Sequence, residues 1–184
     1  NDRELKIGVD LETSTDLKNS SLTITDNAGG MNKDEIIKCF HLFHSQKSTK
    51  KFSDRFLGFY GFGFKGATSK IGNEITIISS ENSKIYHQVV ANYKLLENGK
   101  EKGVTYQEFK HNTASKKLFN GGYKGTKIII KDFNAEIREE VLLYYLPISW
   151  KKFLNTNDLG LPIQLKLNNT KIIAQTFDIS SETL

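Results

Sequence analysis

Short segments in which apolar and polar residues alternate recur through most of the sequence, and they constrain the fold more than any other feature. In residues 4–12, for example, leucine, isoleucine and valine occupy every second position. A period of two is typical of a strand with one buried and one exposed face. Polar turn signals separate these segments. We therefore predict strands over residues 4–12, 20–26, 74–80, 84–95, 104–109, 124–133, 163–168 and 171–177.

Two segments have helical periodicity instead. Asn32 can cap a helix that ends near residue 43, with acidic residues in the first turn where they meet the positive end of the helix dipole. Residues 136–154 predict a long helix that Pro147 bends or interrupts. Helices combined with a mostly antiparallel sheet in this order predict an α/β (α+β) two-layer sandwich. The βαβ alternation of a doubly wound fold is not present.

Composition and charge narrow the class of protein. The 184 residues fit one domain, 1–184. The formal net charge is +5, and residues 38–70 hold seven basic residues and one acidic residue, so the basic surplus is local. It permits a polyanionic partner, which could be nucleic acid, a membrane or a phosphate ligand. The single cysteine, Cys39, excludes an internal disulfide and favours a reducing compartment, the cytoplasm or, in a eukaryote, the nucleus.

The first of three candidate motifs is the turn at residues 26–31, Asp-Asn-Ala-Gly-Gly-Met, at the end of a predicted strand. The carboxylate of Asp26 can accept a hydrogen bond from an exocyclic amine. The glycines allow a flat ring to approach the backbone, and Met31 offers a soft apolar contact. Taken alone, the hexapeptide fits a plain strand-to-helix turn equally well.

The second motif is glycine-rich and lies in residues 58–66. Gly58, Gly61 and Gly63 precede a helix-compatible segment, so that backbone N–H groups can turn toward phosphate oxygens, and Lys65 adds a positive charge. The interleaved aromatic residues are expected to be core. The segment follows no Rossmann-type strand and lacks the Gly-Lys-Ser/Thr ending of a P-loop, which disfavours both of those phosphate-binding folds.

The third motif, Gly125-Thr126, opens a strand whose isoleucine run predicts central burial. A threonine hydroxyl at that point can complete the polar lining of a pocket, although threonine is ordinary in strands and carries no weight alone. The specific signal is the order of the three motifs. An Asp-centred turn, a helix, a long loop over residues 44–57, a glycine-rich turn into a second helix and a Gly-Thr strand follow one another.

In this order the sequence resembles the GHKL ATPase superfamily, which comprises gyrase B, the ninety-kilodalton heat-shock chaperones, histidine kinases and MutL proteins. Within it, residues 61–66 and the preceding residues 44–48 look most similar to Microrchidia-type and related prokaryotic ATPases. The resemblance implies the Bergerat fold, a mostly antiparallel mixed sheet with helices on one face. It has motif support over residues 1–133, and residues 134–184 would complete the domain with a helix and a hairpin.

The resemblance also implies ATP binding under a mobile lid. Asp26 matches the aspartate that binds the adenine amino group, and Thr126 matches the threonine of the last motif. Ala28 departs from the pattern because the family usually has glycine there, and we expect this to adjust affinity rather than abolish it. The implied nucleotide-binding residues are Asp26, Ala28, Gly30, Met31, Gly58, Gly61, Phe62, Gly63, Phe64, Lys65 and Thr126.

In the family, a helix that precedes the first strand carries a catalytic glutamate and, four residues later, an asparagine that binds Mg²⁺. Only Asn1-Asp2-Arg3 precede the first predicted strand here, so we assign no catalytic or metal-binding residue within the sequence and expect the Mg²⁺ ligand upstream of Asn1. The intact protein is then expected to bind ATP or ADP, to hydrolyse ATP slowly, and to form a homodimer or larger assembly through other parts of the protein.

Two alternatives remain open at this point. The basic residues 38–70 could contact nucleic acid in a non-enzymatic binding module, whose affinity would fall steeply with salt. Histidine-kinase-like phosphotransfer fits less well, because no phosphoacceptor-helix sequence is present. We predict no membrane partner, since no apolar run approaches the ~20 residues that a membrane span needs.

Overall fold

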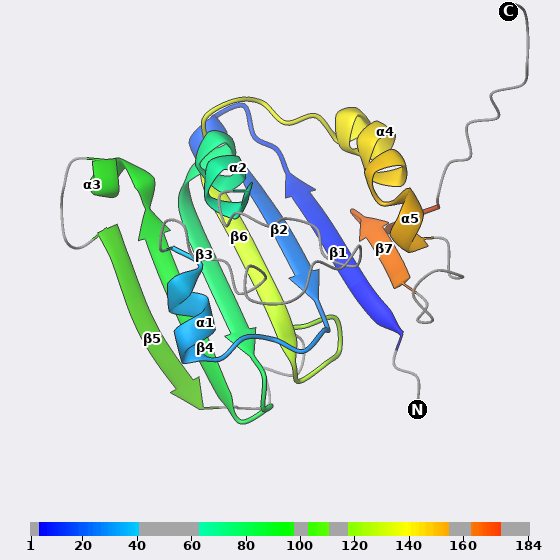
Figure 1. Ribbon diagram of the computed structural model, residues 1–184. Coiled ribbons are helices and arrows are strands. Elements are labelled where there is room, and N and C mark those ends of the chain that lie inside the picture. The colour runs from blue at the N-terminus through cyan, green and yellow to red at the C-terminus, as the bar shows by residue number, and fades with distance from the viewer. Residues whose placement is uncertain (1–3, 41–62, 98–102, 111–117, 155–162, 174–184) are drawn as a thin grey trace, which may run out of the picture.

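A computed structural model describes residues 4–40, 63–97, 103–110, 118–154 and 163–173. Its centre is an eight-stranded sheet with the strand order β5-β4-β3-β6-β2-β1-β7-β8 (Figure 1). The strands are β1 (Leu5–Glu12), β2 (Ser21–Asp26), β3 (Gly72–Ser80), β4 (Ile85–Asn92), β5 (Val104–Lys110), β6 (Gly125–Phe133), β7 (Ile163–Leu167) and β8 (Thr170–Ile172). The helices are α1 (Lys33–Lys38), α2 (Gly63–Ile71), α3 (Tyr93–Glu97), α4 (Glu139–Ser149) and α5 (Lys151–Leu154), and a 3-10 turn, η1, spans Leu17–Asn19.

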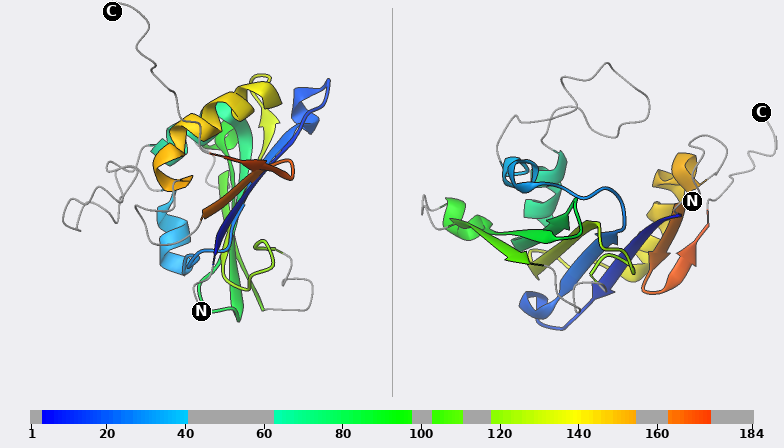
Figure 2. Two further views of the ribbon diagram at one scale, coloured as in Figure 1. Left: turned by 90° about the vertical axis from the view of Figure 1, so that its right-hand side faces the viewer. Right: turned by 90° about the horizontal axis from the view of Figure 1, so that it is seen from below.

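The architecture is the predicted two-layer sandwich. Helices α1, α2, α4 and α5 all lie on one face of the sheet (Figure 2). Strands β1 and β7 run parallel, whereas the other neighbouring strands pair antiparallel. The prediction of a mostly antiparallel mixed sheet with helices on one face is therefore confirmed.

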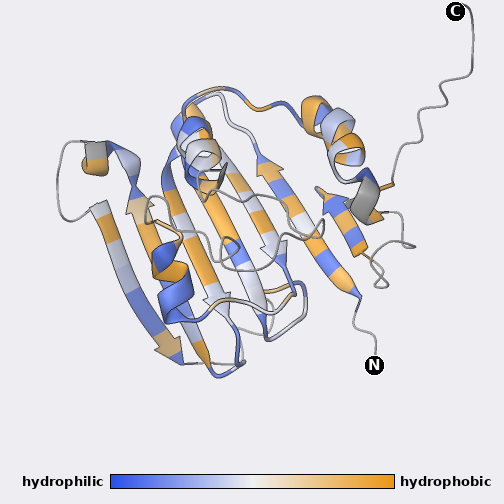
Figure 3. Ribbon diagram, viewed as in Figure 1, coloured by the Kyte–Doolittle hydropathy of each residue, from blue (hydrophilic) through white to orange (hydrophobic). Residues whose placement is uncertain are grey.

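The face of the sheet toward the helices consists of rows of cross-strand neighbours, and two of these rows are apolar. The first row runs through Val9, Ile24, Ile128, Ile77 and Val89, which are register partners in successive strands. The second row includes Leu11, Leu22, Ile130, Ile75 and Ala91. All but Ile24 and Ile128 are buried, and the alternation of apolar and polar residues is visible as bands along the strands (Figure 3). These rows form the core that the periodicity of two predicts.

The first predicted helix is confirmed at its start. The side chain of Asn32 accepts a hydrogen bond from the N–H of Glu35, and the Glu35 carboxylate accepts the N–H of Asn32 in return, which is a complete capping box. The helix α1 itself ends at Lys38, earlier than the expected residue 43. Residues 41–62, which include the whole predicted loop 44–57, lie outside the described part of the chain.

Two boundaries differ from the prediction for identifiable reasons. The predicted strand 84–95 ends at Asn92, whose side-chain oxygen accepts the N–H of Leu95 at 3.2 Å and so starts the short helix α3. The predicted helix 136–154 is divided into α4 and α5. The division falls at Trp150, whose backbone leaves the helical region three residues after the buried Pro147.

Candidate functional site

The turn after β2 is fixed to the first strand by an asparagine. The side-chain oxygen of Asn27 accepts the N–H of Lys6 at 2.7 Å, and its amide nitrogen donates to the carbonyl of Glu4 at 3.1 Å. The preceding residue, Asp26, faces the helices, since it shares a row with Ile7 of β1 and Thr126 of β6. Asp26 is the last residue of β2, whose end lies at the lower edge of the sheet in Figure 1, where the turn begins.

Asp26 is partly buried and partly compensated. Burial raises the pKa of the Asp26 carboxyl above its usual value of 3.8. Backbone N–H groups of Ala28 and Thr126 donate to the carboxylate and act in the opposite direction on the pKa, with Ala28 at 2.9 Å. An ionised carboxylate has about four lone-pair sites, so Asp26 has further lone pairs with which to accept hydrogen bonds from a ligand.

The second half of the turn packs against the end of β3, and its backbone requires glycine. Gly30 has a φ of +73°, and a methyl group there would overlap the carbonyl oxygen of Ser80. The next residue, Met31, donates its N–H to the hydroxyl of Ser79 at 2.8 Å. Glycine at position 30 therefore lets the turn lie directly on the β3 backbone.

Ser79 also joins the third motif to the first. Its hydroxyl donates to the carbonyl of Gly125 at 2.9 Å and lies 3.0 Å from the hydroxyl oxygen of Thr126. Gly125 has a φ of +145°, and a side chain there would overlap the carbonyl of Asp26. The Asp26 turn and the Gly125-Thr126 strand are thus in direct contact, and this contact requires glycine at position 125.

The described part of the second motif is the start of α2, and it lies near Met31 through contacts of Cys39 and Phe40. The thiol of Cys39 is 3.7 Å from that sulfur, and the ring of Phe40, just after α1, packs edge-on against Phe64 of α2 at 6.2 Å between centroids. Burial raises the pKa of the Cys39 thiol, and the nearby positive charge of Lys65 works against that rise. Lys65 is therefore near Cys39, whose thiol contacts Met31 of the Asp26 turn.

The structure places the predicted site residues as follows. It brings together Asp26, Gly30, Met31 and Thr126. In α2, Phe64 packs against Phe40, and Lys65 lies near Cys39, which contacts Met31. Ala28 is exposed in the same turn, and Gly63 begins α2. Gly58, Gly61 and Phe62 lie outside the described residues.

Sequence reasoning did not identify Ser79, His87 and Glu108, which lie in the same row of the sheet as Asp26 and Thr126. Asp26, Thr126, Ser79, His87 and Glu108 are successive register partners across five strands, which makes a polar row beside the two apolar ones. No sequence signal marks the row, because neighbouring members are 8 to 100 residues apart in the sequence and are aligned only by strand register. The row is a property of the sheet.

The far end of the polar row is a compact polar cluster. Nδ1 of the buried His87 is 2.9 Å from the hydroxyl of Tyr106, which donates to the Glu108 carboxylate at 3.1 Å. The ammonium of Lys33, the first residue of α1, lies 5.1 Å from the centre of the Tyr106 ring. The cluster attaches the start of α1 to the edge strand β5, on the side of α1 away from Asp26.

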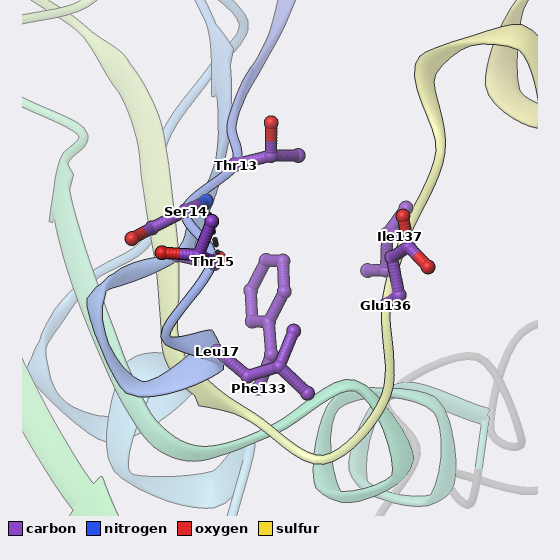
Figure 4. Close-up of a pocket in the computed structure, with 8 residues that line it drawn as sticks. Thr13, Ser14, Thr15, Leu17, Phe133, Glu136 and Ile137 are labelled. Carbon is purple, nitrogen blue, oxygen red and sulfur yellow. Dashed lines mark hydrogen bonds between the residues drawn. The ribbon is translucent and has the colours of Figure 1, made fainter.

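A cavity of about 590 Å³ lies at the opposite end of the sheet (Figure 4). The β1–β2 connection, with Thr13, Ser14 and Leu17, forms one wall, and Glu136 and Ile137 face it across the opening. None of the predicted site residues that the structure describes lines this cavity. Its size alone therefore gives no reason to move the candidate site away from Asp26.

Within the described ranges, no group of three or more His, Cys, Asp or Glu residues is arranged to hold a metal ion. No helix in those ranges is long and apolar enough to cross a membrane.

Comparison with known proteins decides the family. A family model described as "Histidine kinase-, DNA gyrase B-, and HSP90-like ATPase" matches residues 3–122, well over half of the chain. The chain belongs to this ATPase family. The membership confirms the GHKL resemblance that the three ordered motifs indicate.

Individual relatives of this ATPase-family domain are distant or partial. Protein MICRORCHIDIA 4 of Arabidopsis thaliana is 34% identical over 73 residues, which are 40% of this chain and 9% of that protein. The ATPase region of Saccharomyces cerevisiae topoisomerase II is similar in structure, with a TM-score of 0.60 and 14% sequence identity. The same region bound to ICRF-187 (dexrazoxane) gives the same values. Each match covers 91% of this chain and 43% of the topoisomerase chain, so it supports the fold, and the chain spans less than half of these relatives.

Proposed function

We propose that this domain binds ATP, with the adenine ring at the corner formed by Asp26 and Thr126. The observation that carries the proposal is the hydrogen-bonded contact between the Asp26 turn and the Gly125-Thr126 strand through Ser79. A carboxylate and a hydroxyl, adjacent in the same row of the sheet, suit the two N–H donors of an adenine amino group. The glycine at position 30 lets the turn lie against the β3 backbone, and the next residue, Met31, is thereby held by Ser79 beside the corner.

The phosphates would lie toward the start of α2. Backbone N–H groups at a helix N-terminus attract anions, and Gly63 is the first residue of this helix. Gly58, Gly61 and Phe62 would form the turn that leads into it, while Phe64 packs the helix against Phe40 and Lys65 supplies positive charge. Family membership supports this arrangement, in which a basic loop covers the triphosphate.

In the intact protein, closure of residues 41–62 over ATP would drive a conformational change or dimerisation, with slow hydrolysis to ADP. Mg²⁺ normally accompanies ATP in this family, where it neutralises phosphate charge. The described residues hold no cluster that fits the ion, so the Mg²⁺ ligand is proposed to lie outside them. Residues 1–184 are proposed to act as one nucleotide-binding domain.

Equilibrium titration of the full-length protein with a fluorescent ATP analogue tests this function. We expect saturable binding that competes with unlabelled ATP and is lost in Asp26→Asn. Asp10→Asn is a matched control, because Asp10 is exposed on β1 and shares a row with Thr23 on the opposite face of the sheet. Absence of saturable binding by the wild-type protein, or equal binding by both variants, would refute the proposal.

The nucleic-acid alternative rests on the basic residues 38–70, most of which lie outside the described ranges. The reported matches give it no support. The same titration separates the two functions, because phosphate-backbone binding weakens steeply with salt and does not depend on Asp26.

A further inference from the structure

The hydroxyl of Ser79 has one proton, and the geometry determines where it goes. The hydroxyl lies 2.9 Å from the carbonyl oxygen of Gly125, which can only accept, so Ser79 must be the donor of that bond. The other two groups around the Ser79 oxygen are the N–H of Met31 at 2.8 Å and the hydroxyl of Thr126 at 3.0 Å. Both of them must therefore donate to Ser79.

These hydrogen bonds determine the direction in which the Thr126 hydroxyl donates its proton. Ser79 is 0% exposed, so water does not compete for its oxygen. With its only proton directed at Ser79, the Thr126 hydroxyl offers lone pairs, and no donor, to a ligand. Its neighbour in the row, Asp26, is also an acceptor when ionised. The corner between the two side chains therefore presents hydrogen-bond acceptors only.

We propose that Ser79 is a positioning residue that sets the purine preference of the site: by holding the proton of Thr126, it selects a 6-amino purine over a 6-oxo purine. This inference rests on the proposed function. An amino group donates two hydrogen bonds and matches a pair of acceptors. A 6-oxo group would place a third acceptor against them and leave buried polar groups unpaired, which a binding site rejects strongly.

The chain contains a matched control for this role. Ser80 is the next residue in β3, is also 0% exposed, and donates its hydroxyl to the carbonyl of Ile85 at 2.7 Å. It belongs to the opposite face of the strand, away from Thr126. Ser79→Ala and Ser80→Ala each remove one buried serine hydroxyl, but only the first releases the proton of Thr126.

The experiment measures the affinities of the full-length protein for ATP and for inosine triphosphate, whose base carries a 6-oxo group. We expect the preference of the wild type for ATP to fall by roughly fivefold or more in Ser79→Ala, the fold-change that corresponds to one neutral hydrogen bond. The preference should remain at the wild-type value in Ser80→Ala. An unchanged preference in Ser79→Ala would refute the role of Ser79 while leaving the proposed function intact.

Two further measurements distinguish an effect on the hydrogen bonds of Ser79 from unfolding of the variant or loss of the binding site. Ser79→Cys is close in size, and its weakly bonding thiol should lower the preference in the same direction. Hydrogen exchange of the Met31 amide in the absence of nucleotide should accelerate in Ser79→Ala and not in Ser80→Ala; equal rates would contradict the bond network. A wild type that binds neither nucleotide would overturn the proposed function and this inference together, whereas binding of both with equal affinity overturns only the purine preference.

Discussion

Replacing Gly30 by alanine tests whether the turn over β3 depends on a bare backbone. Gly30 has a φ of +73°, and a residue with a side chain pays about 1–2 kcal/mol for this left-handed conformation. The added methyl would also overlap the Ser80 carbonyl oxygen and lie 3.0 Å from the Glu81 nitrogen. Overpacking of this kind costs about 1–3 kcal/mol. We therefore expect Gly30→Ala to lower the free energy of unfolding by roughly 2–5 kcal/mol.

Gly29→Ala is the control, because nothing lies within 4 Å of a methyl group at position 29. Its effect should stay within about 0.5 kcal/mol. Urea unfolding of the two variants and the wild type gives the comparison, provided that the slope against denaturant is unchanged. Displacement of the turn should also weaken ATP binding in Gly30→Ala. If the two variants have equal stability, the close approach of the turn to Ser80 plays no part in holding it.

Three other predictions concern residues in or near the site. Burial raises the pKa of the Asp26 carboxyl above 3.8, so the folded chain binds the carboxyl proton more tightly than the unfolded chain does. The contribution of Asp26 to the stability of the nucleotide-free protein therefore falls as the pH rises from 3.8 through the raised pKa, and it stays low at higher pH. Asp26→Asn should therefore melt at a higher temperature than the wild type at pH 7 without nucleotide, and a lower melting temperature would contradict the burial argument. Phe119→Ala, which removes a fully buried ring stacked at 5.8 Å on Tyr86, should lower the free energy of unfolding in urea by about 3–5 kcal/mol, and a loss below about 1 kcal/mol would contradict the close packing of this ring. Ala28→Gly should change the affinity for ATP by less than about tenfold, because Ala28 is exposed and contributes its backbone N–H to Asp26; complete loss of binding would show that the methyl group is required.

The sequence predicted the sheet well because apolar alternation responds directly to burial on one face. Strand β2, for example, begins within one residue of its predicted start and ends at Asp26 as predicted. The start of α1 was equally predictable, since a capping box involves residues only three positions apart. Features that depend on neighbours in sequence were thus accessible before the fold was known.

Features that depend on strand register were not accessible. Ser79 and Ser80 are adjacent and chemically identical, and only the pairing of β3 with β6 shows that Ser79 meets Thr126. Phe119 lies outside every predicted strand, so nothing in its local pattern indicated a fully buried ring. The end of β4 was misplaced because a hydrogen bond from Leu95 to the Asn92 side chain overrides the continuing apolar pattern.

The parallel pairing of β1 with β7 also affects how the chain folds. Leu5 is the register partner of Ile163, so this contact closes a loop that contains almost the whole domain. Such non-local pairings form slowly, because the entropy of closing the loop opposes them until the intervening strands have assembled. During synthesis from the N-terminus, β1 can pair with β2 early, but its other edge stays open until β7 leaves the ribosome. A chain truncated before residue 163 would keep that edge unpaired, and unpaired edges recruit other strands into aggregates.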